Sequence, residues 1–292
     1  MKIKKVILSL SLLFGFAGTA FCDINDTVRN PIPAKFYSPS EKPGKTILFT
    51  YKNAKSERST VVYLPYGYDE TADTEYPVLY LMHGGGGSSA NYLGPAQSPN
   101  QLAWIFDNAI AAGEISPMIV VCPNDNGSFY AELRKFLIPA VDEAFKTKAD
   151  RNHRAFGGFS MGSVATWNVY LHAMDLVKFF IPMSGDSWVC GNTGGKNYPE
   201  QTAAALSKAD YIEEFAKDFY IFAGNGTNDM AYPNLTPQIE AMKNVTEAFD
   251  YTSGDFSNGN LIYYVVKGNA HSYPHTYEYI YNGLIAFKLK GF

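Results

Sequence analysis

Short hydrophobic runs separated by polar segments recur along most of this chain. Two early runs, residues 45–51 and 59–64, carry β-branched and aromatic residues and predict a pair of antiparallel strands. Six later runs are almost continuously apolar, which is typical of strands buried on both faces of a parallel sheet. These six runs are residues 78–82, 118–122, 154–159, 179–183, 219–223 and 261–266.

The segments between these strands predict helices. The clearest of them are residues 101–112, 136–145, 163–174 and 236–248. Strands that alternate with helices indicate an α/β domain, in which a mostly parallel sheet carries helices on both faces. An eight-stranded sheet whose first two strands form a hairpin is the plan of the α/β-hydrolase fold. We therefore expect one domain with this fold over residues 45–292.

The N-terminal residues follow a different pattern. Lysines near the start precede an apolar stretch, residues 6–16, and small residues come after it, as in a secretory signal peptide. The stretch is shorter than the ~20 residues that a membrane-spanning helix needs. We predict a signal peptide over residues 1–22, cleaved after Ala20 or Cys22, and a secreted, extracellular protein with no membrane attachment after cleavage. The proline-bearing residues 23–44 predict an N-terminal arm.

Composition and charge exclude several function classes. The chain has 292 residues, is 46% hydrophobic and carries a net charge of −4, so it offers no basic surface for nucleic acid. Its His, Cys, Asp and Glu residues show no metal-ligand spacing, and we expect neither a metal nor another cofactor. Cys122 and Cys190 fall outside any disulfide pattern and predict two buried free thiols.

Residues 158–162, Gly-Phe-Ser-Met-Gly, lie where a predicted strand meets a predicted helix. A serine in G-x-S-x-G at such a turn is the nucleophile elbow, which exposes the serine hydroxyl at the top of the sheet. The turn is tight, so Gly158 and Gly162 are needed on either side of Ser160. The N-terminus of the new helix offers free N–H groups and partial positive charge, which suit an oxyanion.

A serine nucleophile needs a base, and the base needs an acid that fixes its tautomer. In this fold the chain order is Ser, then Asp or Glu, then His, each after a strand. Asp229 and His271 follow the last two predicted strands, so the predicted triad is Ser160, Asp229 and His271. Asp186 is an alternative acid, otherwise a wall of the site, and His275 is an alternative base.

Four consecutive glycines follow the predicted strand 78–82 and His83. Such a run is entropically costly, and it allows the backbone to approach a ligand closely. In this fold one N–H of the loop and the N–H after the nucleophile hold the tetrahedral oxyanion. The predicted oxyanion hole is therefore Met161 with Gly85, Gly84 being the alternative to Gly85, while His83 hydrogen-bonds the loop.

Together these segments resemble carbohydrate esterase family 1, particularly its feruloyl esterases, from about residue 45 to residue 292. The resemblance is carried by residues 79–86, 157–162, 183–186, 226–232 with 237–243, and 268–271. It implies Ser160 as nucleophile, Asp229 as acid and His271 as base. One position departs from the family pattern: Tyr273 stands where a tryptophan usually follows the histidine by two residues.

The resemblance implies a secreted serine carboxylesterase that releases ferulic acid from feruloylated arabinoxylan or xylo-oligosaccharides. Trp188 and Tyr273 are the predicted substrate-binding residues, because either ring could stack on a feruloyl group or a sugar. An acetylxylan esterase of the same family is the alternative. An acyltransferase and a non-catalytic carbohydrate-binding protein are remoter alternatives, since one fold serves many functions.

Overall fold

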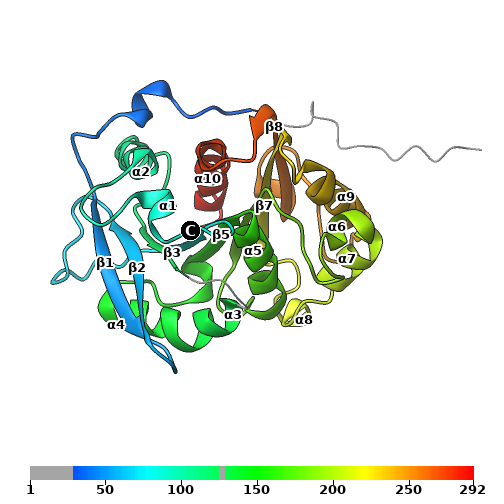
Figure 1. Ribbon diagram of the computed structural model, residues 1–292, viewed down its shortest axis with the longest axis horizontal. Helices are drawn as coiled ribbons and strands as arrows, with labels where there is room; N and C mark the ends of the chain where they lie inside the picture. The colour runs from blue at the N-terminus through cyan, green and yellow to red at the C-terminus, as the bar shows by residue number, and fades with distance from the viewer. Residues whose placement is uncertain (1–28, 125–128) are drawn as a thin grey trace, which may run out of the picture.

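Eight strands form one sheet in the computed structural model, which describes residues 29–124 and 129–292. The order across the sheet is β1-β2-β4-β3-β5-β6-β7-β8, with β1 and β2 antiparallel, β2 antiparallel to β4, and all later neighbours parallel (Figure 1). The strands are β1 (Lys45–Lys52), β2 (Glu57–Leu64), β3 (Val78–Met82), β4 (Ile119–Cys122), β5 (Arg154–Phe159), β6 (Phe179–Met183), β7 (Tyr220–Asn228) and β8 (Leu261–Ala270). The predicted α/β-hydrolase plan is confirmed. The predicted signal peptide lies outside the described residues.

Helices connect the strands and cover both faces of the sheet (Figure 1). The α-helices are α1 (Ala90–Leu93), α2 (Gln101–Ala111), α3 (Phe129–Glu132), α4 (Ile138–Ala144), α5 (Met161–His172), α6 (Gly194–Asn197), α7 (Pro199–Leu206), α8 (Ile212–Phe215), α9 (Tyr232–Lys243) and α10 (Tyr273–Lys288). A π-helical turn, η3 (Leu133–Leu137), leads into α4, and short 3₁₀ turns are η2 (Ala34–Tyr37), η4 (Arg151–His153) and η5 (Phe256–Asn258). The four predicted helices are present with shifted ends.

Helix α10 was not predicted, although it is the longest helix in the described chain. Most of its own residues are buried, including Tyr277, Tyr279 and Ile280, so apolar and aromatic side chains occur on all sides of the helix. The one-sided stripe that identifies an amphipathic helix is therefore weak. Pro274 stands in its first turn, a position where a missing N–H costs nothing.

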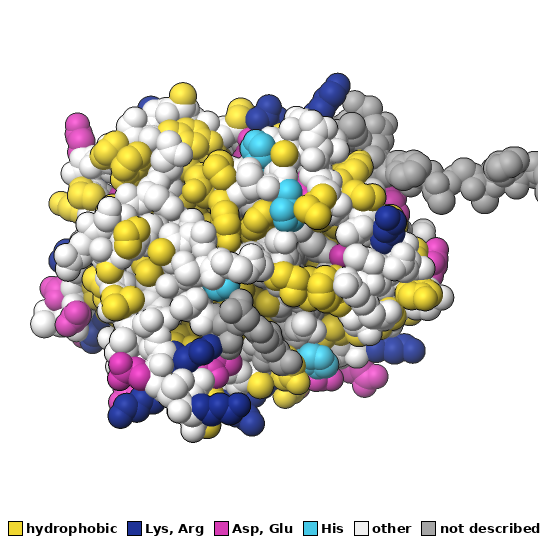
Figure 2. All heavy atoms as spheres, viewed as in Figure 1, with side chains coloured by type: hydrophobic (Ala, Val, Ile, Leu, Met, Phe, Trp, Pro, Cys, Tyr) yellow, Lys and Arg dark blue, Asp and Glu magenta, His cyan; other side chains and the backbone are white. Residues whose placement is uncertain are grey.

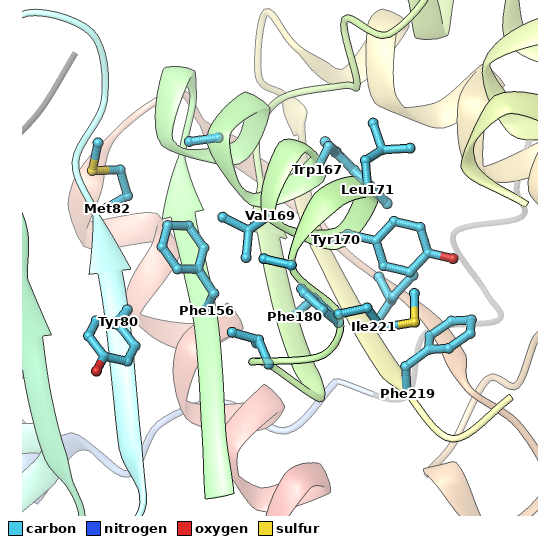
Figure 3. Close-up of a cluster of buried hydrophobic side chains, with 14 of the residues drawn as sticks. Tyr80, Met82, Phe156, Trp167, Val169, Tyr170, Leu171, Phe180, Phe219 and Ile221 are labelled. Atoms are coloured by element: carbon cyan, nitrogen blue, oxygen red, sulfur yellow. The ribbon is translucent and has the colours of Figure 1, made fainter. Parts of the chain in front are cut away.

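Two hydrophobic cores lie on opposite faces of the sheet. Side chains alternate along β3, so Tyr80 belongs to one core while its neighbours Leu79 and Leu81 belong to the other. In the first core Tyr80 and Phe156 lie on the same side of the sheet as the α5 side chains (Figure 3). In the second core α2 and α10 cover the sheet. Packed side chains and helices thus cover both faces of the sheet. We therefore expect a functional site at the ends of the strands.

Strands β7 and β8 extend beyond their predicted ends into polar, glycine-containing sequence. Their pairing continues to Asn228 opposite Ala270, with a register shift between Gly226 and Asn228. A Cβ on Gly226 would overlap the Asn269 backbone, so the absence of a side chain allows this close pairing. The extension brings the residues that follow the two strands next to each other.

The described part of the predicted arm packs on helix α10. Arg29 forms an ion pair with Glu278, with Nε 3.0 Å from Oε1, and the Tyr264 hydroxyl donates to the same carboxylate at 2.9 Å. Asn282 donates to the Asn30 carbonyl at 2.8 Å, and the ring of Phe36 is buried. The arm from residue 29 onward is therefore tied to the domain through its own hydrogen bonds.

No helix in the described ranges is long and apolar enough to cross a membrane. The same ranges contain no group of three or more His, Cys, Asp or Glu side chains placed to hold a metal ion. Cys122 and Cys190 are both free, and burial raises the pKa of the Cys122 thiol. The prediction that both thiols are buried is wrong for Cys190, which is partly exposed in the loop after β6.

Candidate active site

Ser160 occupies the sharp turn between β5 and α5, as the G-x-S-x-G motif predicts. Its φ of 57° and ψ of −113° lie in a region that side-chain-bearing residues rarely adopt. A Cβ on Gly158 would overlap the backbone of Gly162, and one on Gly162 would overlap the Met82 carbonyl. Glycine is thus required on both sides of the serine, and the turn holds the hydroxyl at the edge of the sheet.

Three side chains form a continuous hydrogen-bonded chain at this edge. His271 Nε2 lies 3.0 Å from Ser160 Oγ, and His271 Nδ1 lies 2.8 Å from Asp229 Oδ1. A carboxylate can only accept at Nδ1, so the ring carries its proton there and Nε2 is left to accept the serine proton. The structure brings the three predicted triad residues together from three different strand ends.

Asp229 is an ionised acid held away from water. Its side chain is fully buried, whereas the His271 side chain is 24% exposed. Burial by itself would raise the pKa of the Asp229 carboxyl, but interactions with His271, with the nearby Ser184 hydroxyl and with the Ala231 N–H outweigh burial and lower the pKa. The Ala231 N–H donates to Oδ1 at 2.7 Å, while Oδ2 has no hydrogen-bond partner among the described residues. A charged acid is what the Nδ1 proton of His271 requires.

The alternative acid and base make other contacts. Asp186 accepts the Gly195 N–H at 2.8 Å, and burial raises the pKa of its carboxyl. His275 Nδ1 lies 2.8 Å from the Ala270 N and 3.1 Å from Ser272 Oγ. It therefore stabilises the turn after β8 and is not hydrogen-bonded to Ser160. Asp186 nevertheless lines the cavity beside Ser160, where it forms part of the wall.

The glycine loop after β3 is fixed by hydrogen bonds around Gly84. The Gly84 carbonyl accepts the Gly87 N–H at 3.0 Å and lies 2.7 Å from His83 Nδ1, which gives His83 its expected place in the loop. The Gly84 N–H donates to the Tyr273 hydroxyl at 2.9 Å, so it is already engaged. The Gly85 N–H has no protein acceptor in the described chain.

The two predicted oxyanion donors lie against each other. A Cβ on Gly85 would be 3.1 Å from Cγ of Met161, which places the loop at the start of α5. Met161 is the first residue of this helix, where backbone N–H groups have no partner within the helix. The arrangement can therefore present the N–H groups of Met161 and Gly85 to a negative oxygen near Ser160.

A cavity of about 200 Å³ opens beside Ser160 and His271. Its lining comes from Ser160 and α5, from the loop after β6, from the residues around the start of α9 and from His271 after β8. The lining residues are Ser160, Met161, Val164, Ser184, Gly185, Asp186, Trp188, Thr193, Met230, Ala231, Asn234 and His271. At its rim Met161 is 43% exposed and Met230 is 75% exposed. Hydrophobic side chains border histidine atoms on the face shown in Figure 2. Met230 and Asn234 carry no chemical signature in the sequence and were not predicted.

The two predicted substrate-binding aromatics occupy different places. Trp188 lines the cavity. Tyr273 is not part of this lining: its ring lies 4.9 Å from that of Phe159 and 5.1 Å from that of Tyr92, and its hydroxyl holds Gly84. The direction in which α10 leaves the site turns Tyr273 behind the glycine loop, and sequence spacing does not encode that direction.

Comparisons with known proteins agree with the geometry of the site. The Esterase family model matches residues 52–290, which is most of the chain. The chain belongs to the esterase family. Among curated relatives, endo-1,4-beta-xylanase Y of Acetivibrio thermocellus is 38% identical over 274 residues, which are 88% of this chain and 24% of that protein. An endo-1,4-beta-xylanase/feruloyl esterase of Xylanibacter ruminicola is 36% identical over 214 residues, 68% of this chain and 26% of that one. This esterase-family chain thus spans about a quarter of the length of these curated relatives.

Solved structures share the fold of this esterase-family chain. The feruloyl esterase module from Clostridium thermocellum, in a complex with sinapinate, is 36% identical with a TM-score of 0.80, covering 89% of this chain and 94% of that one. A ferulic acid esterase from Anaeromyces mucronatus is 21% identical with a TM-score of 0.64, covering 87% and 96%, which shows the fold alone. The resemblance to feruloyl esterases seen in the motifs is confirmed.

Proposed function

We propose that this chain is a secreted serine carboxylesterase that releases ferulic acid, or a related hydroxycinnamic acid, from feruloylated arabinoxylan or xylo-oligosaccharides. The observation that carries the proposal is the unbroken chain Ser160–His271–Asp229, with distances of 3.0 and 2.8 Å, beside an aromatic-walled cavity. The identity to a feruloyl esterase module that binds sinapinate, itself a hydroxycinnamate, supports the acyl group.

The geometry accounts for a two-step acyl transfer. His271 Nε2 takes the hydroxyl proton as Ser160 Oγ attacks the ester carbonyl, and Asp229 stabilises the imidazolium that forms. The N–H groups of Met161 and Gly85 hold the oxyanion of the tetrahedral intermediate. The intermediate collapses, the sugar alcohol leaves with the proton from His271, and an acyl-Ser160 ester remains. Water, deprotonated by His271, then attacks this ester and releases the free acid.

The cavity favours an aromatic acyl group over acetate. Trp188 lines the cavity together with Ser160, and apolar Val164 and Ala231 contribute to the same lining. An acetyl group would leave most of the roughly 200 Å³ unfilled, whereas a hydroxycinnamoyl group would bury its ring there. The acetylxylan esterase function is therefore the alternative that the assay must separate. The complete triad weighs against a carbohydrate-binding protein without catalysis.

The proposal extends to the organisation of the whole chain. Residues 1–22 would be a signal peptide removed on export, residues 23–44 an arm and residues 45–292 the esterase domain. The sequence pattern at the N-terminus supports export. Detection of the processed protein in culture medium, with its N-terminus at residue 21 or 23, is the expected outcome of secretion. Retention of the unprocessed chain in cells would contradict it.

The test of the function is a paired assay on methyl ferulate and on acetylated xylan, with Ser160→Ala as the matched control. We expect ferulate release by the wild type and a loss on the order of 10⁴-fold or more in the variant, at an unchanged unfolding temperature. Acetate release without ferulate release would assign the alternative. An active Ser160→Ala variant would contradict the triad.

A further inference from the structure

Tyr273 connects two parts of the site that are far apart in the sequence. It lies two residues after the base His271, yet its hydroxyl accepts the N–H of Gly84 in the glycine loop at 2.9 Å. One short segment, from the end of β8 to the first residue of α10, therefore holds Ser160 through His271 and the glycine loop through Tyr273.

The ring of Tyr273 is held in place on both sides. Its centroid lies 4.9 Å from that of Phe159, and Tyr92 meets it edge-on at 5.1 Å with an interplanar angle of 88°. Phe159 also contacts His271, with centroids 4.4 Å apart, and directly precedes Ser160. Phe159 thus packs against both residues of the segment, and the hydroxyl of Tyr273 has a defined position.

The glycine loop leaves room for this hydroxyl. A Cβ on Gly87 would lie only 2.8 Å from the Tyr273 oxygen and 3.0 Å from the Gly84 carbonyl. The Gly84 carbonyl in turn accepts the Gly87 N–H, so the peptide groups on both sides of Gly84 are fixed. The next N–H along the chain belongs to Gly85. A Cβ on Gly85 would lie 3.1 Å from Cγ of Met161, so Gly85 is next to the start of α5.

We propose that Tyr273 is a positioning residue for the oxyanion hole: its hydroxyl fixes the Gly84 peptide so that the Gly85 N–H faces the oxygen of the tetrahedral intermediate. The inference rests on the proposed function and deepens it. The contact needs an acceptor at this position, which a tyrosine hydroxyl supplies. Phenylalanine retains the ring but has no acceptor, and an indole has only a donor. The glycine loop of this chain is therefore matched to its tyrosine.

The decisive variant is Tyr273→Phe, with Tyr277→Phe as the matched control. Tyr277 is a buried tyrosine of the same helix and, among the described residues, has no hydrogen bond to the glycine loop. We expect kcat on methyl ferulate to fall about tenfold in Tyr273→Phe with KM within about twofold, because an oxyanion contact acts in the transition state. Binding of phenylboronic acid, which forms a tetrahedral adduct on Ser160, should weaken by a similar factor. Binding of the product ferulate should not change.

A second measurement does not depend on catalysis. Hydrogen exchange of the Gly84 amide should accelerate in Tyr273→Phe and stay at the wild-type rate in Tyr277→Phe. Gly87→Ala, which pushes a methyl group against the same hydroxyl, should lower kcat with little effect on KM. This variant tests the contact from the loop side.

The outcomes separate the two proposals. Unchanged kcat, boronate affinity and amide exchange in Tyr273→Phe would overturn the positioning role while the esterase stands. A wild type that is inactive on all esters would overturn the proposed function, and the exchange of Gly84 would still decide whether Tyr273 fixes the loop. A rise in KM with an unchanged kcat would make Tyr273 a substrate contact and contradict the positioning role.

Discussion

Asn228 pairs with Ala270 at the far end of the β7–β8 ladder, one residue before Asp229 and His271. The acid and the base therefore leave neighbouring strands at the same level, and their side chains meet at 2.8 Å. The register shift between Gly226 and Asn228 sets this level: from the Gly226–Val266 pair to the Asn228–Ala270 pair, β8 advances four residues while β7 advances two. The distance in the triad depends on the sheet as much as on the side chains.

The role of Asp229 is tested by Asp229→Asn with Asp186→Asn as its counterpart in the cavity wall. We expect the first variant to lose about 10³- to 10⁴-fold in kcat, because an amide no longer selects the Nδ1–H tautomer of His271. The second should lose less than about tenfold, since Asp186 has no hydrogen bond to His271. Steady-state kinetics on methyl ferulate gives the result. A reversed ranking would move the acid to Asp186.

The lowered pKa of Asp229 also predicts how stability changes with pH. The carboxyl binds a proton less readily in the folded than in the unfolded chain. Its contribution to the free energy of unfolding is therefore present above the ordinary carboxyl pKa of 3.8 and is lost as pH falls below it. Urea unfolding between pH 6 and pH 3 should show a smaller decrease for Asp229→Asn than for the wild type. Equal slopes for the two proteins would be evidence against an ionised, stabilised Asp229.

Thr227 links the ends of the two strands that lead to the acid and the base. Its hydroxyl accepts the N–H of Gly268, which has a φ of 86°, at 2.9 Å. We expect Thr227→Val, which retains the shape of the side chain, to lower kcat about three- to tenfold by loosening the approach of His271 to Asp229. Thr252→Val is the control, because the Thr252 hydroxyl bonds the Asp255 carbonyl in a different loop. A kcat equal to that of the control would show that the β7–β8 pairing holds Asp229 and His271 together without the Thr227 hydrogen bond.

Trp188 is the wall residue that should distinguish aromatic from small acyl groups. Trp188→Ala removes the aromatic side chain from the lining of the cavity beside Ser160, and we expect KM for methyl ferulate to rise about tenfold, as for the loss of an aromatic contact of about 1.4 kcal/mol. Hydrolysis of a small acetate ester, whose acyl group does not reach the ring, should change less than twofold. Comparing kcat/KM for both esters in one preparation provides the measurement. Equal losses on both substrates would indicate a structural role for Trp188.

The chemistry of the site could be predicted from local sequence. The nucleophile elbow follows from Gly158 and Gly162 around Ser160, because the steric requirement of that turn lies within five residues. Asp229 and His271 could be assigned because each follows a recognisable apolar strand in the expected chain order. The sheet could be predicted as well, since strands buried on both faces are continuous apolar runs.

The orientation of side chains between distant segments could not be predicted in this way. The sequence predicts Tyr273 as a substrate-binding residue beside Trp188, but in the structure its hydroxyl binds Gly84 and it does not line the cavity. The extension of β7 and β8 depends on pairing between two polar segments, each of which has weak strand propensity by itself.

The sequence by itself therefore determined the fold class and the three side chains of the proposed triad, because periodic burial and a tight turn are local constraints. The tertiary structure alone decided which backbone N–H groups remain open to an oxyanion and which aromatic ring borders the cavity. The N–H of Gly84 is engaged because Tyr273, far away in the sequence, reaches the loop, whereas the N–H of Gly85 has no protein acceptor among the described residues. Contacts of this kind depend on the relative placement of whole elements, which no local pattern contains.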